Sequence, residues 1–349
     1  MKEVQIHSKD THNNTILQKN LQGKAFKNTT NIKKTHNIHH DMAHQNTTQC
    51  EGGEAQNNLQ FKTHKLFMLL CCTAARLGNR LFMYALSYAI AKQNKMQLYL
   101  DTEFSNIKDM FPHISEPSLK ISELKHFKKI YALEEHGHAT FTMFSIPDCD
   151  VKLAAYLQSF KYFQNYEDDI RHILNISMKY KHEPQMLIQN IREEMTRNYT
   201  NHGAYISSKD IVVIGIHFRL GDVLTEYGVR PPFKYFYNAV DFYKRKYRHV
   251  HFILTTDNKK LLKSAKYFPT DIAHVTMSPF LSYQNDFALM TLCDHMIITI
   301  GTFSWWAGYL ANGDVVYYDQ MSSEGFKPRN GFREDDFYPK GWIKLGESL

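Results

Sequence analysis

The sequence is poor in aromatic residues at its start and poor in cysteine throughout. Residues 1–60 contain a single aromatic residue, Phe26, although aromatics make up 13% of the chain. Such a stretch has too little apolar surface to offset the entropy of ordering, so we predict a disordered polar tail over residues 1–62. The five cysteines show neither a disulfide framework nor the spacing of a zinc site.

Long apolar runs are also missing. Residues 66–75 are apolar, but the run is far short of the roughly 20 residues that a membrane-spanning helix needs. Residues 296–311 form a longer uncharged run, but its threonines, serine and glycine fit a buried strand followed by a helix. The first thirty residues lack the apolar region of a signal peptide. The sequence as given therefore predicts no membrane anchor.

The chain also has little net charge for its length. The chain has 349 residues, a formal net charge of +7 and 43% hydrophobic residues. The apolar residues are numerous enough for a large folded unit. The net positive charge is too small, however, to predict the basic face of a nucleic-acid-binding protein. Nucleic-acid binding through the tail is disfavoured for the same reason. Metal binding by the tail histidines is disfavoured because nothing around them supplies a rigid second shell; they are His36, His39, His40 and His44.

The folded part begins with an alternating strand and helix pattern. Residues 65–73 have the length and apolarity of a buried strand, and a tight turn over 74–80 follows. Apolar residues then recur at helical spacing from Leu81. Residues 98–100 read as the next strand. This order predicts a βαβ unit and a parallel sheet. Residues 103–200 are mixed and mostly helical, including an amphipathic helix over 182–198.

A second alternating unit begins near residue 210. The run IVVIGI at 211–216 is typical of a strand buried on both faces, and further strands and helices alternate to Tyr318. We therefore predict an α/β fold with two Rossmann-type domains facing a cleft. The N-terminal domain spans 63–205, and the C-terminal domain spans 206–349.

The densest polar cluster follows the 211–216 strand directly. Because the carboxyl ends of parallel strands meet at one sheet edge, its side chains are expected to face a ligand there. Arg219 suits a phosphate, since a guanidinium is planar, always charged and bidentate. His217 and Asp222 can hydrogen-bond a sugar or base. The alternative is a surface ion pair between Arg219 and Asp222, which contributes little.

Three further loops occupy similar positions. Arg76 and Asn79 lie between a strand and a helix, around a glycine that permits close approach of a ligand; Asn79 alternatively caps the helix. Asp257 ends the next C-terminal strand and offers a carboxylate to a base or a diol, or a helix cap. Thr302 and Ser304 open a helix, where hydroxyls and free N–H groups make an anion site. The neighbouring Trp305 and Trp306 are interpreted as core residues rather than as a stacking platform.

Six motifs in order then resemble a known family. They are RLGN followed by Leu81-Phe82, YLQSFKYF at 156–163, GIHFRLGD at 215–222, TTDN at 255–258, DFALMTLCDHMIITIGTFSWWAGYL at 286–310 and DDFYPKGWI at 335–343. Together they are similar to the α-1,2-fucosyltransferases of glycosyltransferase family 11, over about residues 65–345.

The resemblance implies a GT-B-like fold, GDP-fucose as donor and α-1,2 transfer to a terminal galactose, with inversion and without a metal or other cofactor. It implies that Arg219 holds the donor diphosphate, that His217 and Asp257 recognise the nucleoside, and that Thr302 and Ser304 lie near the phosphates. Arg76 and Asn79 are expected to face the fucose and the acceptor. A general base must activate the acceptor hydroxyl, and Asp222 is our candidate.

Departures from the family pattern leave alternatives open. Leu220 stands where the family usually has a second arginine, and Arg80 where it usually has glutamine; Arg80 is our candidate for the missing cation. Animal members usually carry an N-terminal membrane span, so the family predicts a Golgi membrane location that these residues do not support. One alternative is a degenerate member that binds nucleotide or glycan without transfer. Another is a manganese-dependent transferase using Asp148-Cys149-Asp150, which follows no strong apolar strand.

Overall fold

The computed structural model describes residues 66–69, 75–120, 128–130, 144–145, 150–153, 157–262, 269, 271–325 and 332–347. The chain separates into two units, residues 1–53 and 54–349, and every described residue belongs to the second unit. The polar tail predicted over residues 1–62 lies outside the described residues.

The first sheet lies in the N-terminal part of the described chain. Its five strands are all parallel, in the order β3-β2-β1-β5-β4. They are β1 (Leu66–Leu69), β2 (Gln97–Asp101), β3 (Ser118–Leu119), β4 (Lys128–Ile130) and β5 (Val151–Leu153). The predicted βαβ unit is confirmed, because β1 and β2 pair in parallel with a helix between them. The strands between 103 and 153 are so short that no apolar period reveals them.

The second sheet has six parallel strands in the order β11-β10-β9-β6-β7-β8. They are β6 (Val212–Phe218), β7 (Val250–Thr256), β8 (Val275–Met277), β9 (His295–Ile298), β10 (Val315–Tyr318) and β11 (Ile343–Leu345). The strand expected at 211–216 continues through His217 and Phe218. Those two residues were expected in the loop that follows the strand. Because they belong to β6 instead, the sheet fixes their side chains.

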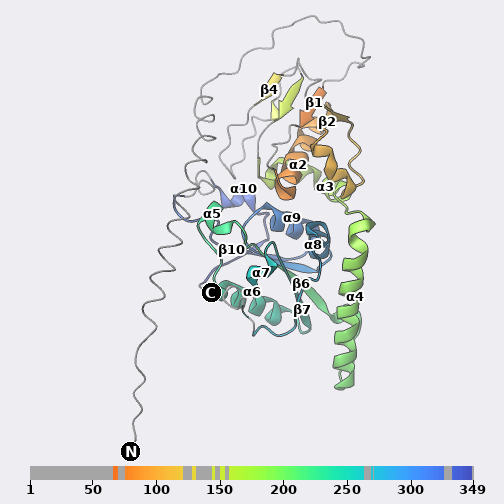
Figure 1. Cartoon of the computed structure of the whole chain (residues 1–349), viewed down its shortest axis with the longest axis vertical. Coiled ribbons are helices and arrows are strands. Elements are labelled where there is room, and N and C mark those ends of the chain that lie inside the picture. The colour runs from red at the N-terminus through yellow and green to blue at the C-terminus, as the bar shows by residue number, and fades with distance from the viewer. Residues whose placement is uncertain are drawn as a thin grey trace, which may run out of the picture. The chain divides into compact units, whose positions relative to one another are not determined.

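Helices connect these strands and cover the sheets (Figure 1). They are α2 (Leu77–Gln93), α3 (Glu167–Ile173), α4 (Met178–Asn201), α5 (Val223–Tyr227), α6 (Phe233–Lys246), α7 (Lys259–Leu262), α8 (Tyr283–Thr291), α9 (Thr302–Ala311) and α10 (Glu334–Phe337). Short 3-10 turns occur at η1 (Phe104–Asp109), η4 (Phe160–Tyr162), η5 (Gln164–Tyr166) and η6 (Ser208–Asp210). Among the described residues, no helix is long and apolar enough to cross a membrane.

Side chains alternate between the two faces of β6. Ile214, Ile216 and Phe218 belong to the apolar cluster that includes α6, whereas Val213 belongs to the cluster that includes α8 and α9. Both faces of the central strand are therefore buried, as its unbroken apolar run predicts. With helices on both sides of a parallel sheet, the predicted α/β class is confirmed.

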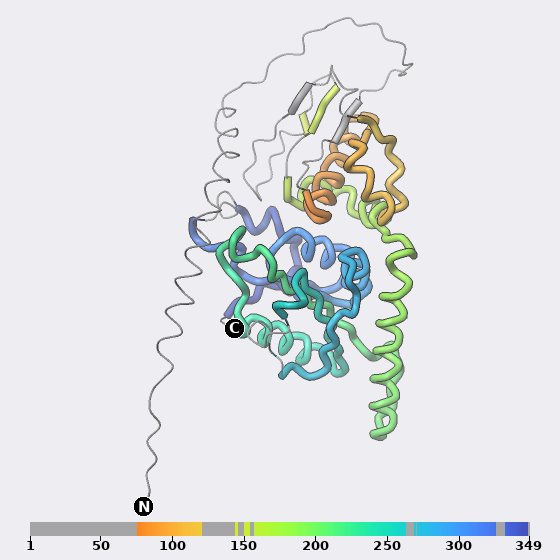
Figure 2. The backbone as a smooth tube through the Cα atoms, viewed as in Figure 1, coloured from red at the N-terminus to blue at the C-terminus, as the bar shows by residue number. Residues whose placement is uncertain are grey.

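One apolar cluster joins the two halves of the described chain. Trp305 and Trp306 on α9 contact Phe82 on α2, with ring centroids 4.5 and 5.1 Å apart. Both tryptophans are fully buried, so their interpretation as core residues is confirmed. The meeting of α2 and α9, which are more than two hundred residues apart, can be followed in Figure 2.

Two segments cross the boundary predicted between the domains. Helix α4, placed in the N-terminal domain from sequence, packs on α8 of the second sheet. Helix α10 returns to the N-terminal side, where Asp336 pairs with Lys161 at 2.5 Å. It also contacts α9, because the Phe337 carbonyl accepts from the Trp305 indole at 2.8 Å. The domain limits 63–205 and 206–349 stay predictions.

Candidate functional site

A cavity of about 820 Å³ lies where the carboxyl ends of β6 and β7 meet the first turns of α2 and α9. Six of the eight site residues predicted from sequence line it, namely Arg76, Asn79, His217, Arg219, Asp257 and Thr302. The other two, Asp222 and Ser304, are not part of its wall. Six residues predicted from their positions beside strand ends and helix starts thus meet at one cavity, as expected where parallel strands end at a common edge.

Arg219 is held rigidly at the end of β6. Its Nε donates to Asp222 Oδ1 at 2.8 Å, and its Nη1 donates to the Tyr227 hydroxyl at 3.2 Å. The guanidinium also lies over the Tyr227 ring, 4.9 Å from the centroid. Burial lowers the pKa of Arg219, but its interactions with Tyr227 and Asp222 outweigh this and raise the pKa. The site therefore contains a permanent, oriented positive charge.

The N-terminus of α9 faces the same charge. Its N-cap is Gly301, whose φ of 111° disfavours other residues, and a Cβ there would lie 2.5 Å from Arg219 Nη1. The free N–H groups of the first helical turn together with a guanidinium make an anion site. Ser304 is fully buried and its hydroxyl donates to the Gly301 carbonyl at 3.2 Å. Its predicted role near phosphate stays a prediction.

Helix α2 contacts α9 directly. It begins at Leu77, so the turn expected over residues 74–80 is wrong for residues 77–80, which form the first turn of the helix. A Cβ on Gly78 would lie 2.5 Å from the Thr302 carbonyl carbon, so this glycine permits close approach of α9; it also lines the cavity. Asn79 Oδ1 accepts from Thr302 Oγ1 at 2.7 Å and from Gln158 Nε2 at 3.1 Å. The N-cap position belongs to Arg76, not to Asn79.

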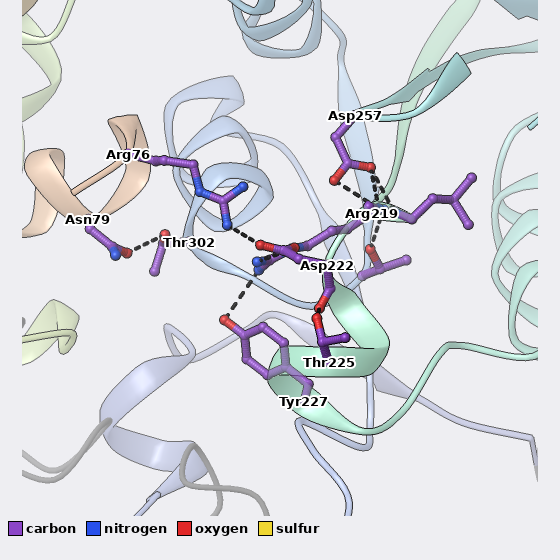
Figure 3. Close-up of polar contacts among 11 residues, drawn as sticks. Arg76, Asn79, Arg219, Asp222, Thr225, Tyr227, Asp257 and Thr302 are labelled. Carbon is purple, nitrogen blue, oxygen red and sulfur yellow. Dashed lines mark hydrogen bonds and ion pairs between the residues drawn. The ribbon is translucent and has the colours of Figure 1, made fainter. Parts of the chain in front are cut away.

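Asp222 lies between two arginines (Figure 3). Its Oδ1 accepts from Arg219, and its Oδ2 contacts Arg76 Nη2, which comes from the start of α2. Partial burial raises the pKa of the Asp222 carboxyl, but Arg219 and Arg76 outweigh this and hold the pKa below its ordinary value. A carboxylate in this environment is a weak proton acceptor. Its role as general base stays a prediction.

Asp257 binds backbone of the neighbouring loop. Its Oδ1 accepts from the Leu220 amide at 2.7 Å and from the Gly221 amide at 3.1 Å (Figure 3). The carboxylate therefore shapes the turn that follows Arg219. Its side chain still lines the cavity, and recognition of a nucleoside by Asp257 stays a prediction.

His217 is the most buried titratable group in the wall. It is 4% exposed, its ring centroid lies 5.3 Å from that of Phe303, and its Nδ1 has no partner among the described residues. Burial lowers the pKa of His217 to about 4, although Asp257 opposes the shift. The imidazole is therefore neutral near pH 7, and its Nδ1 is buried without a hydrogen-bond partner among the described residues.

The family model for Glycosyl transferase family 11 matches residues 37–346. The chain belongs to this family. Similar curated proteins include galactoside 2-alpha-L-fucosyltransferase SEC1 of Bos taurus, 24% identical over 284 residues, which covers 78% of this chain and 73% of the relative. Galactoside alpha-(1,2)-fucosyltransferase 1 of Mus musculus is 25% identical over 288 residues, covering 78% and 71%. The resemblance drawn from the six motifs is confirmed.

Two solved structures are also similar. One is Arabidopsis thaliana FUT1, as a mutant in complex with GDP, with a TM-score of 0.42 and 14% identity, covering 84% of this chain and 77% of that chain. The other is NodZ alpha-1,6-fucosyltransferase co-crystallized with GDP, with a TM-score of 0.39 and 13% identity, covering 70% and 92%.

The two departures from the family pattern have different surroundings. Leu220 is 1% exposed and packs in the apolar cluster beside β6 and α6. Arg80 lines the cavity, as a residue that replaces the missing cation must. Its guanidinium is already engaged, because Nε donates to the Ala75 carbonyl at 2.8 Å and Nη1 to Asn106 Oδ1 at 2.5 Å. Whether Arg80 replaces the missing cation stays a hypothesis.

Tyr227 and Asp286 are among the cavity residues that the sequence did not predict. Asp286 is 8% exposed, accepts from the Ser278 hydroxyl and lies 3.6 Å from Lys259 Nζ. Burial raises the pKa of Asp286 although both partners oppose it. A charged residue opening an otherwise apolar stretch was the available signal. Of the manganese alternative, Asp148 and Cys149 lie outside the described residues, as do the tail histidines.

Proposed function

We propose that this protein transfers fucose from GDP-fucose to the 2-hydroxyl of a terminal galactose on a glycan, with inversion at the anomeric carbon. Membership of family 11 supports glycosyl transfer. Similarity to galactoside alpha-(1,2)-fucosyltransferases supports the donor sugar, the acceptor and the linkage. At about 25% identity these relatives leave the linkage and the acceptor to experiment.

The observation that carries the proposal is Arg219, fixed against the N-terminus of α9 at the cavity wall. Cleavage of the bond between fucose and phosphate leaves negative charge on the departing diphosphate while the sugar becomes oxocarbenium-like. Donors already aimed at that charge stabilise the transition state without reorganising. Arg219 and the free N–H groups of the first α9 turn are such donors.

The remaining wall residues suit the other parts of the two substrates. A neutral His217 in the cavity wall suits an uncharged nucleoside, and Asp257 and Asp286 add carboxylates at the same end of the sheet. Thr302 stands at the phosphate end. Asn79 presents its amide group to the cavity from α2, where the fucose and the acceptor would lie.

Activation of the acceptor hydroxyl requires a proton acceptor. Asp222 is our candidate, and its two arginine partners lower its proton affinity, so deprotonation of the acceptor would be late in the reaction. We further propose that transfer needs no metal, with cationic side chains and helix N–H groups meeting the leaving-group charge. Transfer that persists in excess EDTA would support this point, and its loss with restoration by manganese would contradict it.

The decisive experiment measures transfer from GDP-fucose to a galactose-terminated acceptor by the purified chain and by Arg219→Ala. Loss of one aimed donor should lower kcat about 10²–10³-fold, because the charge on the leaving group is no longer met. Arg245→Ala is the matched control, since Arg245 is an exposed, ion-paired arginine on α6 away from the cavity.

Near-full activity of Arg219→Ala would contradict the assignment. Product linkage, read by specific fucosidase digestion, tests the 2-hydroxyl and the anomeric outcome. Calorimetric GDP binding by the wild-type chain without any transfer would instead favour the degenerate member that binds nucleotide alone.

A further inference from the structure

The cavity wall at the end of β6 offers one arginine for a ligand with two phosphoryl groups. The next position, Leu220, is 1% exposed and packs in the apolar cluster, so it brings no charge to the cavity. Under the proposed function, on which this inference rests, Arg219 and a helix N-terminus would face the whole diphosphate. A second cation close to Arg219 would complete the charge balance of that site.

Arg76 is the nearest such cation that the hydrogen bonds identify. Asp222 Oδ1 accepts from Arg219 Nε at 2.8 Å and lies 2.7 Å from its Nη2. The other carboxylate oxygen, Oδ2, contacts Arg76 Nη2. One carboxylate thus holds two guanidinium groups beside each other, one from the start of α2 and one from the end of β6 (Figure 3). Both arginines line the cavity.

The two arginines differ in how firmly they are held. The Arg219 side chain is 13% exposed and is also held by Tyr227, so its orientation is fixed. The Arg76 side chain is 70% exposed and Asp222 is its one polar partner among the described residues. An ion pair this exposed to water is weak and is readily exchanged for another anion. A phosphoryl group, with its planar match to a guanidinium fork, is a suitable replacement.

We propose that Arg76 is the second diphosphate-binding cation, supplied by α2 and held next to Arg219 by the shared Asp222 carboxylate until the donor binds. The incoming diphosphate takes over the Arg76 guanidinium from Asp222, while Arg219 keeps its contacts with Asp222 and Tyr227. Arg76 was expected from sequence to face the fucose and the acceptor; its place beside Arg219 directs it to the phosphates instead. The rival cation, Arg80, is turned toward the Ala75 carbonyl and Asn106.

The test compares nucleotides that differ only in phosphate. Binding of GDP, GMP and guanosine to the full chain is measured by calorimetry for wild type, Arg76→Ala, Arg76→Lys and Arg80→Ala. Arg76→Ala should weaken GDP binding roughly 10-fold or more, as expected for loss of a charge-assisted contact, and should leave guanosine binding unchanged. Arg76→Lys should recover part of the loss, because the charge returns without the fork.

Controls separate this role from a structural one. Arg245→Ala, in an equally exposed ion pair, should bind all three ligands as wild type does. Equal thermal midpoints for Arg76→Ala and wild type establish that the variant folds, and steady-state kinetics should show a raised KM for GDP-fucose with an unchanged KM for the acceptor.

Three outcomes would overturn the inference. GDP binding unchanged in Arg76→Ala but weakened in Arg80→Ala would assign the second cation to Arg80. A raised KM for the acceptor with normal GDP binding in Arg76→Ala would show that Arg76 contacts the acceptor rather than the diphosphate. If wild-type protein binds no GDP at all, the proposed function itself fails and this inference with it; if wild type binds GDP and transfers fucose, only the role of Arg76 is at issue.

Discussion

Three side chains of the site depend for their chemistry on what surrounds them. His217 is buried without a partner for Nδ1, Arg219 is fixed by Asp222 and Tyr227, and Asp222 is shared between two arginines. Each has a pKa displaced from its ordinary value. Displaced pKa values gathered in a cavity are typical of functional sites.

A pH dependence of stability follows from His217. Its pKa in the folded protein is about 4, below the value of roughly 6.5 in an unfolded chain, so the unfolded state binds more protons between those limits. The stability contribution of neutral His217 is therefore fully present above about pH 6.5 and is lost as the pH falls toward 4. Between about pH 7 and pH 5 the free energy of unfolding should fall by roughly 2 kcal/mol for this group.

Urea denaturation at a series of pH values checks this expectation. His217→Gln should flatten the pH slope, whereas His182→Gln, on the exposed side of α4, is the matched control. Burial also lowers the pKa of His251 to about 4, so the double variant with His251→Gln should flatten the slope further. A slope unchanged by His217→Gln would contradict the buried, neutral imidazole.

How far the site was predictable also depends on single residues. His217, Arg219 and Asp257 were found because each closely follows an apolar strand, and strand ends share an edge. Asp286 and Tyr227 do not directly follow a strand. Asp286 is buried in the wall, and Tyr227 is held there by Arg219. The order of residues shows neither the burial nor the arginine contact. The shared Asp222 carboxylate joins positions 146 residues apart, a pairing that only the fold creates.

At the scale of elements, the contact between α2 and α9 places the two sides of the cavity. Gly78 allows the first turn of α2 to reach the backbone of Thr302, and Asn79 then bonds to the Thr302 hydroxyl. The strand and helix order was predictable from apolar periodicity. The packing partner of Gly78 was not, because a glycine in sequence carries no sign of what approaches it.

Gly78→Ala tests that contact. The added methyl would lie 2.5 Å from backbone, which cannot yield as a flexible side chain would. We expect a loss of about 1–3 kcal/mol in the free energy of unfolding, together with weaker GDP binding as Thr302 shifts. Denaturant titration and calorimetry measure the two effects.

Gln93→Ala, at the exposed end of the same helix, is the control and should stay within about 0.5 kcal/mol of wild type. A Gly78→Ala protein with wild-type stability and nucleotide affinity would show that α2 and α9 do not need this approach.

At the scale of the whole described chain, the two sheets are joined by a common core. Phe82 and Phe163 from the N-terminal side contact Trp305 and Trp306 from the C-terminal side. The sequence predicted two Rossmann-type α/β domains facing a cleft, but it did not reveal the apolar core that they share. Apolar periodicity shows which face of an element is buried, not which distant element covers it.

This shared core predicts a single cooperative unfolding step. Far-ultraviolet circular dichroism and tryptophan fluorescence should give coincident denaturation curves, because neither half keeps its core when the other unfolds. Trp306→Ala should cost about 3–5 kcal/mol and shift both curves together. Two separated transitions, with only the fluorescence curve moved by Trp306→Ala, would contradict a common core.

The return of α10 to the N-terminal side has a consequence for synthesis of the protein. The Phe337 carbonyl accepts from Trp305, Asp336 pairs with Lys161, and β11 completes the edge of the second sheet. These contacts form only after residues 334–345 have left the ribosome, whereas Arg76 and Arg219 emerge much earlier. A nascent chain therefore carries both arginines well before α10 can pack on the apolar core that the two sheets share.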